Sequence, residues 1–580
     1  MANENKKSGH YPHLERINNP CDLKNIPAQE LTSLADEIRS FLIARVTENG
    51  GHLASGLGMV EATLAIHRVF SSPKDHIIFD VGHQSYTHKL ITGRREEFAS
   101  LRRGGGISGF PKRSESEHDA FGTGHSSTSL SAALGFAEAD RLSGSDAYTV
   151  CVFGDGAFTG GMIHEALNNC RRDLHLVMIL NENDSSVSQN IEELVGSFDN
   201  LSYYGPIDGN NVHAVEALLA SVKVSGKACL VHIKTQKGKG YAPAEEHPDL
   251  YHCLTPCGTI HPEGHSFSEE MGAHLSELAQ KNMKICAITA AMTSGTGLSS
   301  FQKAHPERFF DVGIAEPHAV TFAAGLAANG YHPVVAIYSS FLQRAYDNII
   351  HDVALQNLPV VFCIDRAGLN SADGATHHGI FDVAFLSQIP NISIYTPITN
   401  QVLRSVMDEA LTLGSPVAIR YPNGYEDAAI YEAFYSQTAT VSGRARADYS
   451  LEEKAKLDAV IITHGRIATE AIRAKDALKK EGKRVGIILL EQLKPYDKIA
   501  AEVAVLLPEH SCRILFLEEE MRAGGMGMNL SAALADCEVM QNKSIHIRAL
   551  DNHFALQTKN EPIWKSACLD CDAIVHDILF

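Results

Sequence analysis

Two polar residues that end neighbouring predicted strands have types and spacing suited to binding a cation. Asp155 lies between two glycines in GDGAFTGG (154–161), directly after the apolar run 148–153, and Asn183 follows the next apolar run, 174–180. The carboxyl ends of parallel strands meet at one edge of a sheet, where α/β proteins bind ligands. Carboxylate and amide oxygens are hard donors that suit Mg²⁺ or Ca²⁺. The pattern therefore predicts a cation that bridges Asp155 and Asn183 to a phosphate-bearing ligand.

The glycines of this loop fit neither common nucleotide-binding motif. A dinucleotide fingerprint needs a third glycine where the chain has Thr159, and a P-loop needs a lysine where it has Met162. The loop alone could also be a turn whose aspartate caps a helix. An asparagine at a strand end 28 residues after Asp155 favours the cation site over that alternative.

Three blocks of the chain repeat the strand–helix–strand pattern that must position these residues. Between the first two strands, Ile163, Ala166, Leu167 and Cys170 recur at helical spacing, which indicates one buried helix face. Such units predict an α/β fold of three domains, each a mostly parallel sheet flanked by helices. The apolar runs are 148–153 and 174–180, 332–338 and 359–365, and 457–465 and 483–490, with a helical pattern over 341–357 in the second block.

Two segments without clear periodicity mark the expected domain boundaries. The segment 243–265 is rich in Pro, Gly and His, and a second linker is expected near 423–440. The predicted domains are 1–265, 266–435 and 436–580.

Composition favours a cytoplasmic enzyme or binding protein. The 580 residues carry a net charge of −19 without a long run of Lys or Arg, so we expect no nucleic-acid and no membrane partner. No stretch approaches the ~20 apolar residues of a membrane-spanning helix, and the first residues lack the apolar core of a signal peptide. The twelve cysteines are scattered and read as reduced thiols, although Cys253/Cys257 and Cys568/Cys571 leave a zinc site as an alternative.

The Asp155–Asn183 pair resembles the thiamine diphosphate signature, in which an asparagine follows GDG at about this distance. Together with motifs along nearly the whole chain, it resembles the 1-deoxy-D-xylulose-5-phosphate synthase family of transketolase-like enzymes more closely than transketolase proper. The motifs are GGHLASGLG (50–58), DVGHQSYTHKLITGRR (80–95), GHSSTSL (124–130), KGKGYAPAE (237–245), DVGIAEPHAVTFAAGLA (311–327), YSSFLQRAYDNIIHDVA (338–354), DRAGLNSADGATHHG (365–379) and RYPNG (420–424).

This resemblance implies a site for thiamine diphosphate and Mg²⁺. Glu316 would hydrogen-bond a pyrimidine ring nitrogen and activate the cofactor, a role that suits a buried carboxyl with a raised pKa. Without the resemblance, a glutamate after an apolar strand is more simply a solvated strand end. The implied metal ligands are Asp155, Asn183 and the backbone carbonyl of Ser185. The implied cofactor-binding residues are His83, Gly124, His125, Ser126, Gly156, Ala157, Asn183, Tyr241, Glu316 and Phe341.

The implied reaction is the decarboxylative condensation of pyruvate with D-glyceraldehyde 3-phosphate, which gives 1-deoxy-D-xylulose 5-phosphate, an isoprenoid precursor, and CO₂. The candidates for proton transfer and substrate orientation are His52, His83, His377 and Asp373. Permanently charged, bidentate arginines suit a phosphate, although each could instead form a surface ion pair. The implied substrate-binding residues are Tyr338, Arg344, Arg366 and Arg420.

The resemblance also assigns a role to each domain and implies a homodimer. Residues 1–265 would bind diphosphate and Mg²⁺, 266–435 would bind the pyrimidine and carry the activating glutamate, and 436–580 would form a transketolase-type C-terminal domain.

Three features depart from the family pattern. The segment between Ser185 and GPIDG (205–209) is short, so part of the expected active-site cover is reduced. Pro317 follows the glutamate and is expected to restrict Glu316 toward extended backbone. Asn423 stands where the family commonly has arginine, which removes a positive charge near the expected phosphate site. The alternatives are an enzyme with another acceptor aldehyde or a ketose donor, a non-catalytic cofactor-binding paralogue, and a subunit of a 2-oxo acid dehydrogenase complex.

Overall fold

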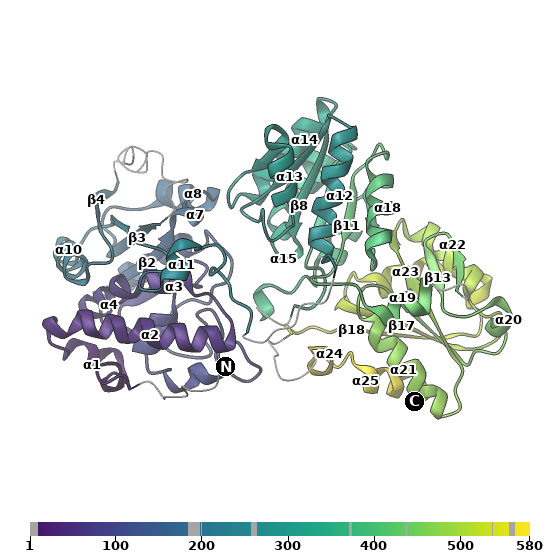
Figure 1. The fold of residues 1–580 in the computed structure, drawn as a ribbon, viewed down its shortest axis with the longest axis horizontal. Helices are drawn as coiled ribbons and strands as arrows, with labels where there is room; N and C mark the ends of the chain where they lie inside the picture. Colours follow the sequence, from purple (N-terminus) through teal and green to yellow (C-terminus); the bar gives the residue numbers. More distant parts are fainter. Residues whose placement is uncertain are drawn as a thin grey trace, which may run out of the picture. The chain divides into compact units, whose positions relative to one another are not determined.

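The structure is a computed structural model that describes residues 10–183, 198, 200–256, 264–370, 374–435, 439–535, 537–555 and 563–580. The chain divides into two compact units, Met1–Ile260 and His261–Phe580, which Figure 1 draws as ribbons. Within the described ranges, no helix combines the length and the apolar character needed to cross a bilayer.

The first unit is built on a parallel sheet. Its strands are β1 (His76–Phe79), β2 (Thr149–Gly154), β3 (Leu176–Glu182), β5 (Cys229–Lys234) and β4 (Ser202–Asp208), in that spatial order, and all pair in parallel. Successive residues of β2 enter different cores: Val150 and Val152 pack on one side of the sheet, and Cys151 and Phe153 pack on the other. Burial on both faces explains why these strands are continuous apolar runs.

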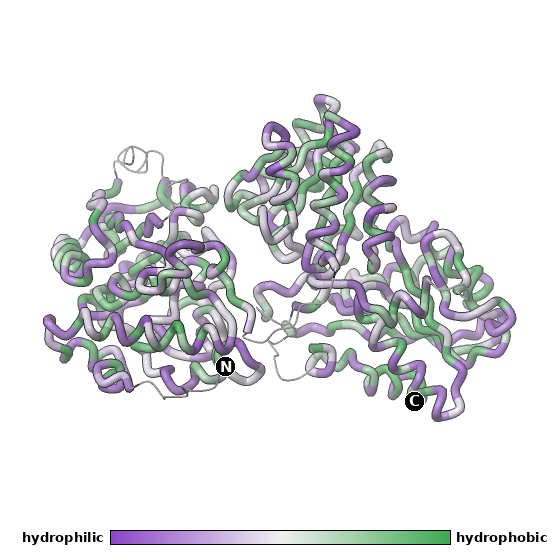
Figure 2. The backbone as a smooth tube through the Cα atoms, in the orientation of Figure 1, coloured by the Kyte–Doolittle hydropathy of each residue, from purple (hydrophilic) through white to green (hydrophobic). Residues whose placement is uncertain are grey.

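Helices cover both faces of this sheet. One core contains residues of α2 (Leu31–Asn49), α4 (Val60–Val69) and α10 (Val212–Ser225), and the other contains residues of α6 (Ser129–Ser143) and α8 (Gly161–Asn169). Figure 2 shows hydrophilic and hydrophobic residues alternating along α2, as one buried face requires. The apolar stripe predicted for α8 is confirmed, because Ile163, Ala166, Leu167 and Cys170 are all buried.

The second unit contains two sheets. The first has the order β16 (Gln492–Lys494), β10 (Ser393–Tyr395), β11 (Val417–Arg420), β9 (Val361–Asp365), β8 (His332–Tyr338), β6 (Ile285–Thr289) and β7 (Phe309–Asp311). Every pair is parallel except β16 with β10. Residues of α12 (Phe267–Lys281) and α18 (Asn400–Ala410) pack in one core and residues of α14 (Glu316–Ala328) in another. This sheet therefore takes its antiparallel edge strand from the C-terminal part of the chain.

The second sheet of this unit is mostly parallel. Its order is β12 (Thr440–Ser442), β13 (Ala445–Ala447), β15 (Val485–Leu490), β14 (Ala459–Thr463), β17 (Arg513–Met521) and β18 (Ser544–Leu550). The last four strands pair in parallel, and β12 and β13 are antiparallel. The two cores of the unit each contain residues from both sheets, so each core extends across the two sheets. The predicted fold class is confirmed.

Two segments differ from the prediction. The helical pattern over 341–357 forms four short pieces: α15 (Ser339–Leu342), a 3₁₀ turn, α16 (Tyr346–Asn348) and a π-helix, η6 (Ile349–Ala354). Apolar spacing does not distinguish these turns from a continuous α-helix. The expected linker 423–440 contains a helix, α19 (Ala428–Tyr435), whose Ile430 and Phe434 are fully buried. Two apolar residues one helical turn apart were the signal that the linker prediction overlooked.

Candidate functional site

Asp155 and Asn183 lie together at the carboxyl edge of the first sheet, as predicted. They directly follow β2 and β3, which are neighbours in the sheet. Asp155 Oδ2 accepts a hydrogen bond from Asn183 N at 2.8 Å, and Oδ1 accepts one from Gly156 N at 2.8 Å. Asn183 Oδ1 is buried and has no hydrogen-bond partner among the described residues. A buried amide oxygen beside a carboxylate is costly to leave unsatisfied and suits a hard cation, so the pair fits Mg²⁺. Ser185 lies outside the described residues.

A carboxylate that sequence reasoning missed, Asp80, connects two of the predicted cofactor motifs. It follows β1 and is 1% exposed. Its Oδ1 accepts hydrogen bonds from Ser127 N at 2.8 Å and Ser126 Oγ at 3.1 Å, and its Oδ2 accepts from Ser129 Oγ at 2.7 Å. Ser127 Oγ in turn donates to Ala157 O at 2.9 Å. Asp80 therefore fixes the GHSSTS segment, and that segment is tied to the GDGA loop. The sequence did contain one indication of this role, because Asp80 directly follows an apolar strand, as Asp155 does.

We expect Asp80→Ala to weaken thiamine diphosphate binding by about 10- to 100-fold, the usual effect of removing a residue that orients a binding group. Titration calorimetry in the presence of Mg²⁺ measures this affinity. The matched control is Asp75→Ala, because Asp75 lies near the other end of β1, is buried and accepts hydrogen bonds from Ser71 N and Tyr148 N. Equal losses of affinity in the two variants would show that Asp80 has only a general structural role.

Three histidines meet in the first unit, and only two of them were predicted. The ring centroids of His52 and His83 are 5.5 Å apart, and His252 lies 5.5 Å from His52 and 5.3 Å from His83. Burial lowers the pKa of His83 well below its usual range and lowers the pKa of His252 to about 4, and the neighbouring histidines add to both shifts. Both rings are therefore neutral near pH 7, and each has one unprotonated ring nitrogen. His252 lies in the expected linker, where no periodic pattern pointed to it.

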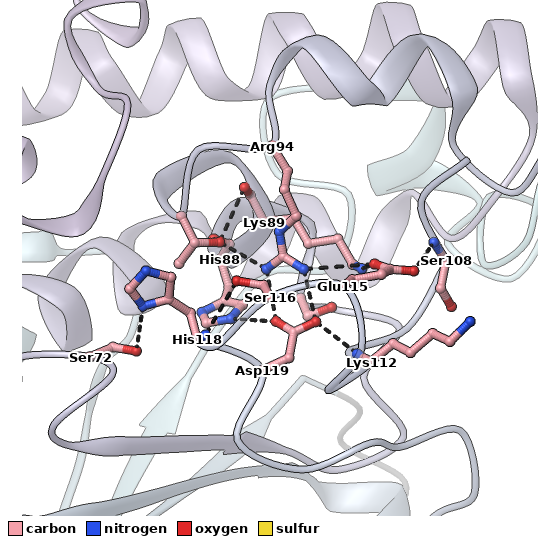
Figure 3. A network of polar contacts seen from close by, with 12 residues as sticks. Ser72, His88, Lys89, Arg94, Ser108, Lys112, Glu115, Ser116, His118 and Asp119 are labelled. Carbon is pink, nitrogen blue, oxygen red and sulfur yellow. Dashed lines mark hydrogen bonds and ion pairs between the residues drawn. The ribbon is translucent and has the colours of Figure 1, made fainter. Parts of the chain in front are cut away.

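A buried ionic network holds the loop 108–119 (Figure 3). Glu115 accepts a hydrogen bond from the fully buried Lys89 at 2.8 Å, and Asp119 accepts two from Arg94 at 2.8 Å each. Each carboxylate also accepts a backbone N–H from within the loop, at 2.6 Å for Glu115 and 2.7 Å for Asp119. The two carboxylates thus bind the loop to the helix α5 (Tyr86–Ile91) and the residues that follow it.

This network positions the loop against the histidines. Burial by itself would raise the pKa of Asp119, but hydrogen bonds from His88 and Arg94 hold that pKa well below its usual range. Asp119 is therefore ionised at neutral pH. The loop's Phe110 ring lies 5.6 Å from the His52 ring, and a Cβ added at Gly82, the residue before His83, would come within 2.3 Å of Pro111 Cδ. Only glycine permits this approach of the loop.

Glu316, the predicted activating residue, begins α14 and is 2% exposed. Burial raises the pKa of its carboxyl, and Arg344, whose Nη1 lies 3.4 Å from Oε2, opposes that shift. The alternative of a solvated strand end is wrong, because the side chain is buried. The expectation that Pro317 restricts Glu316 toward extended backbone is also wrong. Pro317 lies in the first turn of α14, where the missing N–H has no partner within the helix.

Four more predicted residues meet at the carboxyl ends of β8 and β9. The Arg366 guanidinium lies 3.6 Å from the centroid of the Tyr338 ring. The Phe341 ring is 5.7 Å from Tyr338 and 5.3 Å from His377. This arrangement combines a cation, a phenol and an imidazole, which are groups that bind and orient an anionic substrate. Asp373 lies outside the described residues.

Arg420 has different surroundings. It ends β11, is 2% exposed, and donates to Asp382 at 2.9 Å and to Glu520 at 2.5 Å. Burial would lower its pKa, but the two carboxylates outweigh burial and raise it. The ion pairs of Arg420 with Asp382 and Glu520 are therefore buried, so the alternative of a surface ion pair is wrong for this residue. The role of Arg420 in phosphate binding stays a prediction, as do the roles of the other site residues.

The remaining predicted residues lie in the first unit. Ala157 is buried, and Gly156, His125 and Tyr241 are half-buried. Gly156 and Ala157 belong to α7 (Asp155–Phe158), and the Tyr241 ring lies 5.5 Å from the ring of Tyr251.

Among the described residues, no group of cysteines has the geometry of a zinc site. In the part of the chain that the structure describes, the one group of potential ligands that lies close together is His464, Glu518 and Glu520 in the second unit, distinct from the Asp155–Asn183 pair. Arg420 donates to Glu520 in this group and supplies a positive charge there.

Comparison with known proteins identifies the class of the chain and then its family. Residues 264–425 match the transketolase pyrimidine binding domain and 448–570 match the transketolase C-terminal domain, so with the parallel sheets and the buried Glu316 the chain is of the transketolase type. Residues 14–202 match the family model described as 1-deoxy-D-xylulose-5-phosphate synthase. The chain belongs to the 1-deoxy-D-xylulose-5-phosphate synthase family.

Two relatives with this family name agree with the assignment. A 1-deoxy-D-xylulose-5-phosphate synthase of Syntrophomonas wolfei is 41% identical over 97% of this chain and 96% of its own length. That of Carboxydothermus hydrogenoformans is 43% identical over 89% of this chain and 91% of its own. A solved transketolase of Campylobacter jejuni is 16% identical, with a TM-score of 0.45 over 96% of this chain and 100% of that one.

Proposed function

We propose that this protein condenses pyruvate with D-glyceraldehyde 3-phosphate, with thiamine diphosphate and Mg²⁺ as cofactors, to give 1-deoxy-D-xylulose 5-phosphate and CO₂. The observation that carries the proposal is the Asp155–Asn183 pair, with its buried amide oxygen, at a sheet edge. Relatives named for this reaction, at 41–43% identity over 89–97% of the chain, support the choice of substrates. The homodimer and the cytoplasmic location expected from the sequence stay predictions.

The residues of the two units have separate tasks in this reaction. Bound thiamine diphosphate supplies a nucleophilic carbon and an electron sink. Asp155 and Asn183 would hold a Mg²⁺ that neutralises the diphosphate. Glu316, whose pKa is raised by burial, would hydrogen-bond the pyrimidine ring of the cofactor.

The protons and the acceptor are handled by other side chains. His83 is neutral at physiological pH because of burial, so its unprotonated ring nitrogen is available to a reacting hydroxyl. Arg366 and the phenol of Tyr338 present a positive charge and a hydrogen-bond donor to an acceptor phosphate. These side chains thus supply acid–base chemistry and anion binding. The reaction needs both, and the cofactor supplies neither.

A two-substrate assay tests the proposal. With thiamine diphosphate and Mg²⁺, we expect the wild-type protein to release CO₂ from pyruvate in proportion to added D-glyceraldehyde 3-phosphate, and mass spectrometry to detect one 1-deoxypentulose phosphate per CO₂. Omission of Mg²⁺ with a chelator present is the control. Product formed only from ketose phosphates, or from pyruvate with an unphosphorylated aldehyde alone, would contradict the proposal and favour another acceptor or donor.

A further inference from the structure

Two side chains of the C-terminal domain bind the backbone N–H and carbonyl of one residue in the loop 366–379, of which the structure describes 366–370 and 374–379. Glu519 Oε2, in β17, accepts a hydrogen bond from Leu369 N at 3.1 Å. Arg466, which follows β14, donates to the carbonyl oxygen of the same Leu369. The Nε of Arg466 lies 3.7 Å from Glu519 Oε2, so the two side chains form an ion pair around this peptide. We call Glu519 and Arg466 the Leu369 clamp.

The backbone of the loop approaches the clamp closely. Gly368 has φ +86°, and a Cβ added there would lie 2.5 Å from the carboxyl carbon of Glu519. Glu519 is itself 2% exposed, and its Oε2 accepts a further hydrogen bond from Trp564 Nε1 at 3.2 Å. A buried carboxylate with this many donors has a fixed orientation. The clamp is therefore a rigid support.

The clamped residue lies between the predicted substrate residues of the loop. Gly368 and Gly379 exchange two backbone hydrogen bonds, at 2.7 and 2.8 Å, which close the base of the loop. Arg366, on the Tyr338 ring, precedes this base by two residues, and His377 lies just inside it. Asn370 N donates to His378 Nδ1 at 2.9 Å, so the residue after the clamped one is bound to the opposite side of the loop. A shift of Leu369 would therefore displace both Arg366 and His377.

We propose that Glu519 and Arg466 are positioning residues for substrate binding: they hold Leu369 and thereby set the geometry of Arg366 and His377. The C-terminal domain, to which sequence reasoning assigned no substrate or cofactor contact, thus shapes the substrate site. The identity of the substrate rests on the proposed function, whereas the contacts of the clamp do not.

Kinetics of two variants test the clamp. For Arg466→Ala and Glu519→Ala we expect the KM for D-glyceraldehyde 3-phosphate to rise on the order of 10- to 100-fold, because a small misplacement of binding groups has effects of this size. The KM for pyruvate and the affinity for thiamine diphosphate should stay within about twofold of wild type. Glu519→Gln keeps an oxygen for Leu369 N and should recover most of the loss.

The matched control is Asp448→Ala. Asp448 lies in the same domain, forms a 2.7 Å ion pair with Lys475 and accepts a hydrogen bond from Ile487 N, but none of these contacts involves the loop. We expect this variant to lower the thermal unfolding midpoint without changing the ratio of the two KM values. A similar change of both KM values in all the variants would overturn the proposal.

Hydrogen exchange separates this proposal from the proposed function. Without substrate, peptides from 366–379 should exchange faster in Arg466→Ala than in wild type, whereas Asp448→Ala should leave them unchanged. Unchanged exchange in the clamp variant would overturn the proposal. If the wild-type protein failed to use the two substrates, the proposed function would fail, and the exchange result would still decide whether the clamp holds the loop.

Discussion

Glu316→Gln should lower kcat on the order of 10²- to 10⁴-fold in the pyruvate-dependent assay, the usual contribution of a positioned acid–base group. Glutamine fills the same space but cannot exchange the proton that the pyrimidine ring requires. The residue is buried at the start of α14, where burial raises the pKa of the carboxyl. Steady-state rates with both substrates at saturation give the comparison, and calorimetry should find thiamine diphosphate affinity within a few-fold of wild type.

The matched control for this variant is Glu470→Gln. Glu470 is also a buried glutamate of the second unit, but it binds Cys571 N and Arg473 in the C-terminal domain. Its replacement should leave kcat unchanged. A Glu316→Gln enzyme with the wild-type rate would exclude Glu316 from cofactor activation.

Asp155→Ala should reduce Mg²⁺-dependent thiamine diphosphate binding by at least about 100-fold, more than the loss of an orienting residue alone. The substitution removes the charged oxygen donor and also leaves Asn183 N, 2.8 Å from Oδ2, without its acceptor. Calorimetric titration of cofactor at several Mg²⁺ concentrations measures the effect. The wild-type protein should lose the same affinity when Mg²⁺ is chelated.

Asp208→Ala is the control for this prediction. Asp208 ends β4 at the same edge of the same sheet, but it is exposed, and its side chain accepts a hydrogen bond from the nearby Asn210 N at 2.9 Å. Its replacement should not alter cofactor affinity. Wild-type affinity in Asp155→Ala would mean that the cation is held by other residues.

Local sequence patterns predicted the repeated strand–helix–strand units and the polar residues that follow their strands. Helical periodicity alone predicts the apolar stripe of α8. The strands on each side of α8 could be predicted as continuous apolar runs because both faces of the sheet are covered. Asp155 and Asn183 could be placed together because parallel strands end at a common edge. These inferences need only the spacing of residues within one strand–helix–strand unit.

Contacts between distant segments could not be predicted in this way. Asp80 binds serines more than 40 residues later in the chain, and His252 reaches His52 from a segment without periodicity. The Leu369 clamp joins residues about 100 and 150 positions apart. The partner of a side chain in such a contact depends on how whole sheets pack. The type of a single residue does not indicate which distant residue it will contact.

The edge strand β16 has a consequence for synthesis of the chain. It pairs with β10 in the first sheet of the second unit, yet it lies about 100 residues further along the chain, after all the parallel strands of that sheet. At a translation rate of about 5–20 residues per second, β10 waits on the order of 5–20 seconds for this partner. During that interval its open edge can pair with another nascent chain. Protection of this edge by chaperones on the ribosome would therefore matter more for the middle of the molecule than for the first unit, whose strands all emerge before residue 235.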